Sequence, residues 1–135
     1  MFGRHRIAEL TDQLTVSRGD HERVQQTLNA IASQIGYIEF SPSRIVEPAN
    51  DILLSIVGYE RQEVIGKHHR ALCDSSYTAS LEYQHFWEDL GRGIKKQGTF
   101  PRFAKDGRRV WLEATYFPVT NDEGKVFKVI KLATD

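Results

Sequence analysis

Hydrophobic residues in the first quarter of the chain recur at alternating steps of three and four. The series runs Ile7, Leu10, Leu14, Ser17, His21, Val24, Leu28, Ile31 and Ile35. This spacing predicts an amphipathic helix with a heptad seam, which would lie on its own domain or form a coiled coil with a second copy. The middle of the seam is polar and flanks Gly19 and Asp20, a weak helix former and a good N-cap. One helix, or two separated near residues 17–20, would fit the pattern.

Beyond Gly36 the pattern changes to short β-prone runs and short helices. Residues 37–40 and 44–47 read YIEF and RIVE on either side of Ser-Pro-Ser, which predicts a hairpin. A cap residue, Asn50, opens the run NDILLSIVG, so a helix is expected from there to Gly58, with a shorter one at 61–66. The longest helix of the domain is expected from Ser80 to Gly93.

The rest of the chain has the period of strands. Runs at 98–104, 108–119 and 125–134 are β-branched and aromatic, and KDG and NDEG between them are hairpin turns. The order predicts an α+β fold, with a five-stranded antiparallel sheet, short helices on one face and an N-terminal amphipathic helix. Both alternating sets of residues in 108–119 include large apolar groups, so the second face of the sheet is also expected to be covered.

Length and composition limit the classes of protein that fit. With 135 residues and 40% hydrophobic content, one compact domain is expected, formed by residues 36–135, with 1–35 as a helical cap and dimerisation segment. Lys plus Arg equals Asp plus Glu at 18 each, so no net field would attract nucleic acid or an anionic membrane. No apolar run approaches the ~20 residues of a membrane helix, and no signal peptide is recognisable, which predicts a cytoplasmic location.

Two adjacent histidines and the single cysteine lie close together at His68, His69 and Cys73. A structural zinc site needs about four nitrogen or sulfur ligands, and the other histidines are far away in sequence, so no metal site is expected. A cysteine hydrolase needs a base oriented by a third group and an oxyanion hole, which the sequence does not supply. We therefore expect a protein that is not an enzyme.

Three motifs occur in the order GYxxxExxGK at 58–67, KDGRxxW at 105–111 and a terminal ATD at 133–135. With the expected element order, residues 36–135 resemble the PAS domain family, most closely the PAS domains of bacterial chemoreceptors and of aerotaxis and biofilm-dispersal transducers. The resemblance implies a sensory module that encloses a small cavity. It also implies a downstream signalling domain on a longer chain, to which Asp135 would help to couple the last strand.

The resemblance also implies which residues line the cavity: Asn50, His69, His85, Trp87, Leu112, Ala114 and Tyr116. Trp87 is expected on a helix face shared with Leu81 and Leu90. Ala114 and Ala133 are small, which favours a pocket over a filled core.

Three occupancies of this cavity remain open. Haem b would need one axial histidine, His69 or His85. FAD is the cofactor of the aerotaxis relatives, but their Arg-His pair corresponds to Cys73 and Asp74 here, which argues against it. Without a cofactor, His68 would cap or pair at the surface, His69 would be hydrogen-bonded and half-buried, and side chains or a small ligand would fill the cavity.

Two functions follow. The first is a cytoplasmic PAS sensor of a chemoreceptor-type transducer, a homodimer through the N-terminal helix, which responds to a small ligand, oxygen or redox state. The second is a constitutive dimerisation or protein-interaction module with a closed cavity.

Overall fold

The computed structural model describes residues 18–135, which fall into two compact units divided after Gln34. The first contains helix α2 (Arg18–Ala32), and Gly19 and Asp20 lie in its first turn. Leu28 and Ile31 of the expected seam are 54% and 57% exposed. The seam positions before Arg18, and any helix break there, lie outside the described residues.

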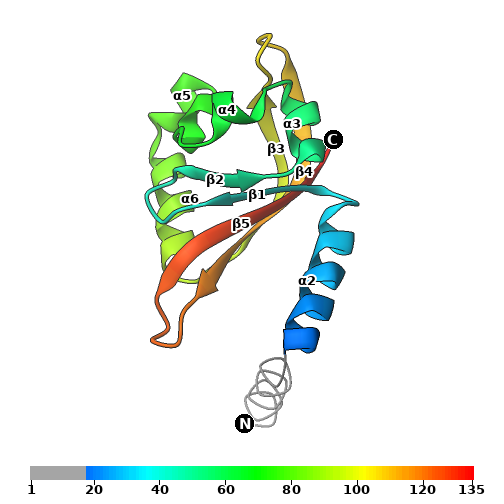
Figure 1. The fold of residues 1–135 in the computed structure, drawn as a ribbon. Coiled ribbons are helices and arrows are strands. Elements are labelled where there is room, and N and C mark those ends of the chain that lie inside the picture. The colour runs from blue at the N-terminus through cyan, green and yellow to red at the C-terminus, as the bar shows by residue number, and fades with distance from the viewer. Residues whose placement is uncertain (1–17) are drawn as a thin grey trace. The chain divides into compact units, whose positions relative to one another are not determined.

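The second unit is an antiparallel sheet with helices on one face (Figure 1). Its strands follow the order β2-β1-β5-β4-β3. The strands are β1 (Gly36–Phe40), β2 (Val46–Ala49), β3 (Lys96–Phe103), β4 (Arg109–Thr120) and β5 (Val126–Thr134). The helices are α3 (Asp51–Val57), α4 (Arg61–Val64), the 3-10 helix η1 (His69–Leu72), α5 (Ser75–Thr78) and α6 (Leu81–Gly91). The predicted fold class is confirmed.

The turn between β1 and β2 is closed by backbone hydrogen bonds around Arg44. Ser41 N donates to Ile45 O at 2.9 Å, and Arg44 N donates to Ser41 O at 2.9 Å. Arg44 has a φ of 71°, a conformation that non-glycine residues rarely adopt. Its guanidinium lies 5.5 Å from the ring centre of Tyr83 and 5.7 Å from that of Trp87, which compensates for the strain by holding the turn against α6.

At the start of β1, Gly36 pairs with Ala133 of β5. A Cβ atom at position 36 would lie 2.8 Å from the backbone oxygen of Ala133, closer than real Cβ atoms come to such an atom. Glycine is therefore required at the entry to the sheet.

The core lies between the helices and the inner face of the sheet, and α6 contributes four residues to it: Tyr83, Phe86, Trp87 and Leu90. The prediction that Leu81 shares their face is wrong, because Leu81 is 70% exposed. At about 100° per residue, Leu81 and Leu90 are about 180° apart around the helix. Leu90 is buried on the true inner face, so Leu81 must point to solvent.

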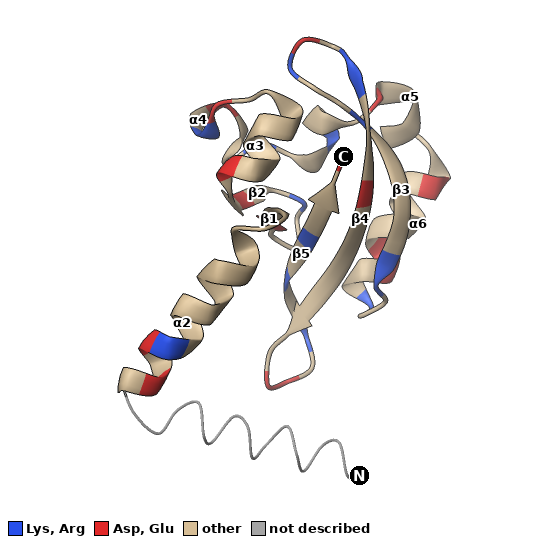
Figure 2. Cartoon of the chain, turned by 90° about the vertical axis from the view of Figure 1, so that its right-hand side faces the viewer, with Lys and Arg blue, Asp and Glu red and all other residues tan. Residues whose placement is uncertain are grey.

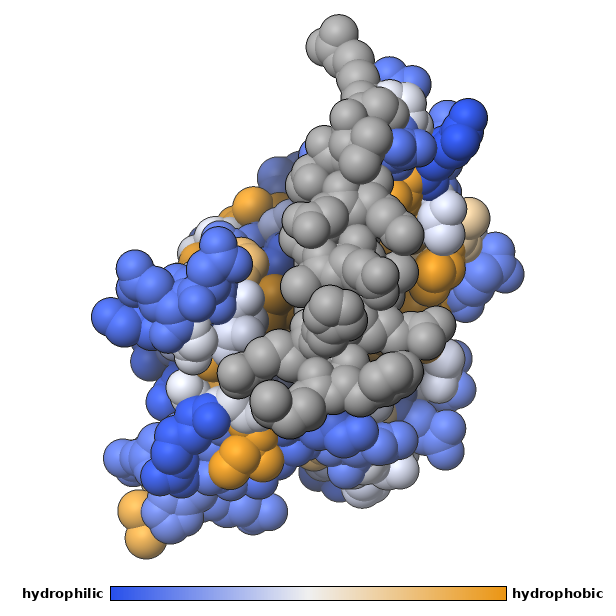
Figure 3. All heavy atoms as spheres, turned by 90° about the horizontal axis from the view of Figure 1, so that it is seen from below, coloured by the Kyte–Doolittle hydropathy of each residue, from blue (hydrophilic) through white to orange (hydrophobic). Residues whose placement is uncertain are grey.

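Charged residues are spread over the helices, turns and strands rather than gathered on one face (Figure 2). Among the described residues on the face that Figure 3 shows, hydrophobic side chains occur as small groups between hydrophilic ones. Within residues 18–135, no helix has the length and apolar character needed to cross a membrane.

Candidate functional site

A polar network lies inside the core and is centred on His69, which is completely buried. Its Nδ1 is 3.0 Å from the Tyr83 hydroxyl, and its Nε2 is 3.0 Å from the Tyr116 hydroxyl. The Nη2 of Arg102 donates to the same Tyr116 hydroxyl at 2.9 Å. The Cys73 sulfur lies 3.6 Å from His69 Nδ1. One connected network therefore joins η1, α6, β4 and β3.

The donors and acceptors of this network settle its direction. Arg102 can only donate, so the Tyr116 oxygen accepts from it. The Tyr116 hydroxyl proton is then satisfied by donation to His69 Nε2, which assigns the proton of the neutral imidazole to Nδ1. That Nδ1–H points to the Tyr83 oxygen. The chain of donation thus runs from β3 through β4 and η1 to α6.

The position of His69 follows from its place at the start of a 3-10 helix. Its backbone N donates to Arg44 O at 2.8 Å, which ties η1 to the hairpin turn. The neighbouring His68 is the N-cap of η1, and its Nδ1 accepts from Arg70 N at 3.1 Å. The two histidines therefore diverge, with His68 capping η1 and His69 inside the core. The expectation that His69 is only half-buried is wrong.

Electrostatics keep His69 neutral. Burial is the main cause that holds its pKa well below 6.5, and the positive charges of Arg102 and Lys131 lower it further. Burial also raises the pKa of the Cys73 thiol above its ordinary value. Burial therefore favours the neutral forms of both groups, and a neutral thiol is a weak nucleophile.

Two cations are enclosed with this network, Arg102 and Lys131, each 2% exposed. They flank Tyr116 from the strands on either side of β4, and the Lys131 ammonium lies 4.9 Å from the Tyr116 ring centre. In residues 18–135 neither cation forms an ion pair with a carboxylate. The Nε of Arg102 is buried and has no hydrogen-bond partner. Buried charges are usually paired, so this pair of cations is exceptional.

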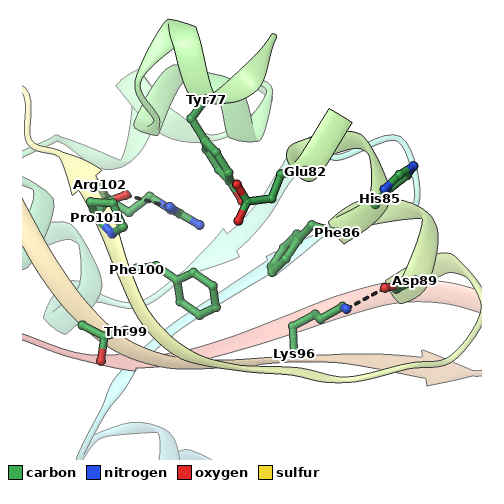
Figure 4. A pocket seen from close by; sticks show the side chains of 10 residues that line it. All are labelled: Tyr77, Glu82, His85, Phe86, Asp89, Lys96, Thr99, Phe100, Pro101 and Arg102. Atoms are coloured by element: carbon green, nitrogen blue, oxygen red, sulfur yellow. Dashed lines mark hydrogen bonds and ion pairs between the residues drawn. The ribbon is translucent and has the colours of Figure 1, made fainter. Parts of the chain in front are cut away.

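A groove of about 760 Å³ leads to Arg102 from the surface between α6 and β3. In Figure 4, the rings of Phe86 and Phe100 lie side by side along the groove, and the Arg102 side chain lies at one end, near Tyr77. The centres of the two phenylalanine rings are 5.6 Å apart and their planes are at 75°, an edge-to-face contact. The groove therefore has an aromatic wall and a cationic end.

Five of the seven predicted site residues meet in the core: His69, Trp87, Leu112, Ala114 and Tyr116. The other two do not join them. His85 is exposed at the rim of the groove, and Figure 4 shows its ring directed away from the two phenylalanines. Asn50 is the N-cap of α3, where its Oδ1 accepts from Leu53 N and Tyr37 N, both at 3.0 Å. Both placements follow from helix geometry, at a helix cap and on the outer side of α6.

The core does not fit a haem or a flavin as its side chains are arranged. Both ring nitrogens of His69 face tyrosine hydroxyls, so neither is free to bind iron. The rings of Phe40 and Trp87 pack edge-on against His69, each with centres 5.1 Å away. The space expected to be a cavity is thus filled by aromatic rings. His85 lies outside this core and offers no enclosed axial position.

Sequence reasoning missed Arg102 and Lys131, although a signal for each was present. Lys131 stands between Val129 and Ala133 in the period of a strand, and Ala133 had been assigned to the pocket. Arg102 follows Phe100 by two positions and therefore shares its face. A charged residue within an otherwise apolar inward set indicates a buried functional group.

Comparisons with known proteins agree with this fold. The family model for the PAS domain matches residues 35–135. The chain is 42% identical over 106 residues to the biofilm dispersion protein BdlA of Pseudomonas aeruginosa. That match covers 78% of this chain and 25% of BdlA, so the chain spans a quarter of the length of this relative.

Solved structures support the same architecture. An RNA-binding light-oxygen-voltage receptor matches 90% of this chain and 35% of its own, with a TM-score of 0.74 and 22% identity. The PAS domain of a protein from Colwellia psychrerythraea matches 83% of this chain and 95% of its own, with a TM-score of 0.71 and 16% identity. At these identities the likeness concerns the fold alone. The family match and the five-stranded sheet together show that the chain belongs to the PAS domain family.

Proposed function

We propose that this domain is the small-molecule input module of a cytoplasmic, chemoreceptor-type transducer and has no enzymatic activity of its own. The observation that carries the proposal is the buried network of His69, Tyr116 and Arg102 at the inner end of the groove between α6 and β3. The similarity to BdlA, a biofilm dispersion protein, supports a role in signalling.

In this proposal a ligand in the groove changes the hydrogen bonds around Arg102. Because Arg102 donates to the Tyr116 hydroxyl and that hydroxyl contacts His69, the change reaches β4, η1 and α6 together. Lys131 lies over the Tyr116 ring, so β5 is affected as well. A ligand acts as a signal only if it binds one arrangement of these elements more tightly than another.

A screen by nuclear magnetic resonance tests the proposal. The full chain would be titrated with a library of small polar and aromatic compounds of all charge types. We expect a subset to shift the resonances of Phe86, Phe100 and Tyr116 together, since these residues form the groove wall and the network beneath it. A library without any compound that perturbs this set would contradict the sensing role and would favour an interaction module with a closed core.

A second candidate, self-association, is favoured by exposed apolar residues. On α2, Leu28 and Ile31 are both more than half exposed, and Trp111 on β4 is 55% exposed. Large apolar side chains gathered on a helix face are usually buried in an assembly. We propose a homodimer that buries the α2 seam against a second copy, and a downstream signalling domain that would respond to the arrangement of the two chains.

Replacing Leu28 by Asp in the full chain tests the dimer. We expect sedimentation to show a dimer for the parent and a monomer for Leu28→Asp, because the charge would have to be buried in the seam. The control is Gln26→Asp, which adds the same charge to an exposed position off the seam and should leave the dimer intact. A parent chain that is already monomeric, or a Leu28→Asp variant that stays dimeric, would refute the α2 interface.

A further inference from the structure

We propose that the groove between α6 and β3 binds a small aromatic acid, with its carboxylate held by Arg102. This inference rests on the proposed function and names the chemical class of its ligand.

Arg102 has more hydrogen-bond donors than the acceptors around it satisfy. Its Nη1 donates to Pro101 O at 2.7 Å and its Nη2 donates to the Tyr116 hydroxyl at 2.9 Å. Both acceptors are neutral, and the Nε–H has no acceptor at all. A guanidinium is always charged and is shaped to bind a carboxylate through two parallel hydrogen bonds. An anion in the groove would supply the charged acceptor that the Arg102 side chain is without.

The positive charge of the Arg102 guanidinium has no carboxylate partner within residues 18–135. In the described part of the chain, no carboxylate comes within ion-pair distance of Lys131 either. Asp89, which also lines the groove, is already neutralised by Lys96 and Arg92, each at 2.6 Å. The uncompensated charge of Arg102 makes the inner end of the groove attractive to an anion.

Phe86 and Phe100 pack edge-to-face against each other and together form one aromatic wall of the groove. The Arg102 guanidinium lies 5.2 Å from the Phe100 ring centre. An aromatic wall favours a flat ring lying against it, in edge-to-face or offset contact. A volume of about 760 Å³ is within the range of small-molecule sites. A ring with a directly attached carboxylate matches both the aromatic wall and the cationic end.

Tyr77 and Glu82 line the groove and affect how a ligand would reach Arg102. The Tyr77 ring covers Arg102, with its centre 5.8 Å from the guanidinium carbon, and it stands on the four-residue helix α5. Its ring is only part-buried, so it can turn aside when a ligand enters. Glu82 also lines the groove and is the one lining carboxylate without an ion-pair partner among the described residues. Its charge opposes an anion, so removing that charge should tighten binding.

The test compares benzoate with benzamide, which has the same shape and no charge. Calorimetric titration of the full chain should show that benzoate binds and benzamide does not. Arg102→Gln should weaken benzoate binding by about tenfold or more, since hydrogen bonds to charged groups contribute about 1.5–3 kcal/mol. Glu82→Gln, at an exposed position, should tighten it a few-fold. Circular dichroism would verify that both variants are folded.

A second measurement needs no substitution. The Arg102 Nε–H is shielded from water and should give a slowly exchanging proton–nitrogen resonance, which benzoate should shift and benzamide should not. Equal binding of both compounds, unchanged affinity in Arg102→Gln, or an unmoved Nε–H resonance would overturn the inference. If neutral library compounds shift the groove while carboxylates do not, the anion site is refuted and the sensing role stands. If no compound of any charge shifts the groove, both proposals fail.

Discussion

Replacing Trp87 by Ala is expected to lower the free energy of unfolding by about 3–5 kcal/mol, the range found when buried aromatic residues are truncated. Trp87 is nearly completely buried, and its ring packs edge-on against Phe40, His69 and Phe86. Its loss would leave a cavity next to the imidazole and remove several aromatic contacts, each contributing about 0.5–1.5 kcal/mol. Such a loss is a large fraction of the ~5–15 kcal/mol that stabilises a typical domain.

The second tryptophan of the chain provides the matched control. Trp111 lies on the outer face of β4 and is 55% exposed, so Trp111→Ala should change the stability by well under 1 kcal/mol. Urea unfolding followed by far-ultraviolet circular dichroism measures both. Similar losses for the two variants would mean that the outer face contributes as much as the core. A Trp87→Ala variant as stable as the parent would place Trp87 outside the core.

The burial of Trp87 could be predicted from sequence, whereas the phase of its helix was only partly predictable. Apolar residues between Ser80 and Gly93 occur on more than one side of the helix, so the sequence allowed Leu81, Tyr83 or Phe86 on the inner face. The spacing alone does not say which of the two opposite faces of the helix packs on the sheet. The structure decides it: Tyr83, Phe86 and Leu90 are buried, and Leu81 lies on the opposite, exposed side. The start of the helix is as predicted, with the Ser80 hydroxyl accepting from Tyr83 N at 3.2 Å.

The strands were easier to predict, because a period of two and turns rich in Gly, Asn and Asp leave few alternatives. What a strand pattern does not reveal is how far a long side chain reaches. Arg102 contacts the hydroxyl of Tyr116, although its backbone pairs with Val110. The candidate site depends on such contacts between residues far apart in sequence. Those contacts form only with the observed register of β3, β4 and β5, which the sequence pattern does not give.

A second large effect is expected at Lys131, where replacement by Met should raise the free energy of unfolding by about 1–4 kcal/mol. That is the range found when buried ion pairs are replaced by apolar residues of similar volume, and an ammonium buried without a carboxylate partner is costlier still. Burial, reinforced by the charge of Arg102, holds the pKa of Lys131 well below 10.5, and the nearby Cys73 opposes this effect only weakly. Methionine keeps the length of the side chain and removes the charge.

The increase in the free energy of unfolding caused by Lys131→Met should depend on pH, in a direction set by the lowered pKa of Lys131. Between the folded-state pKa of Lys131 and 10.5, the unfolded chain binds more protons than the folded one. The stability of the parent therefore rises with pH across this window, and the penalty is greatest below it. The advantage of Lys131→Met should accordingly be larger at pH 6 than at pH 9 in thermal unfolding.

Lys128, on the same strand, is the control for this experiment. Its Nζ lies 3.3 Å from a carboxylate oxygen of Glu39, and it is partly exposed. Lys128→Met should lower the stability by no more than about 1 kcal/mol, because it removes a weak ion pair near the surface. If Lys131→Met is destabilising at both pH values, the lysine charge is compensated within the folded protein.

The strand order also has a consequence for how the domain folds during synthesis. Strand β5 is the last to be made, yet it lies in the middle of the sheet, between β1 and β4. Until it leaves the ribosome, the β1–β2 hairpin and the β3–β4 hairpin lack the strand that lies between them in the sheet. The sheet must therefore close in one late step, and the nascent chain carries two separate hairpins with unpaired edges until then.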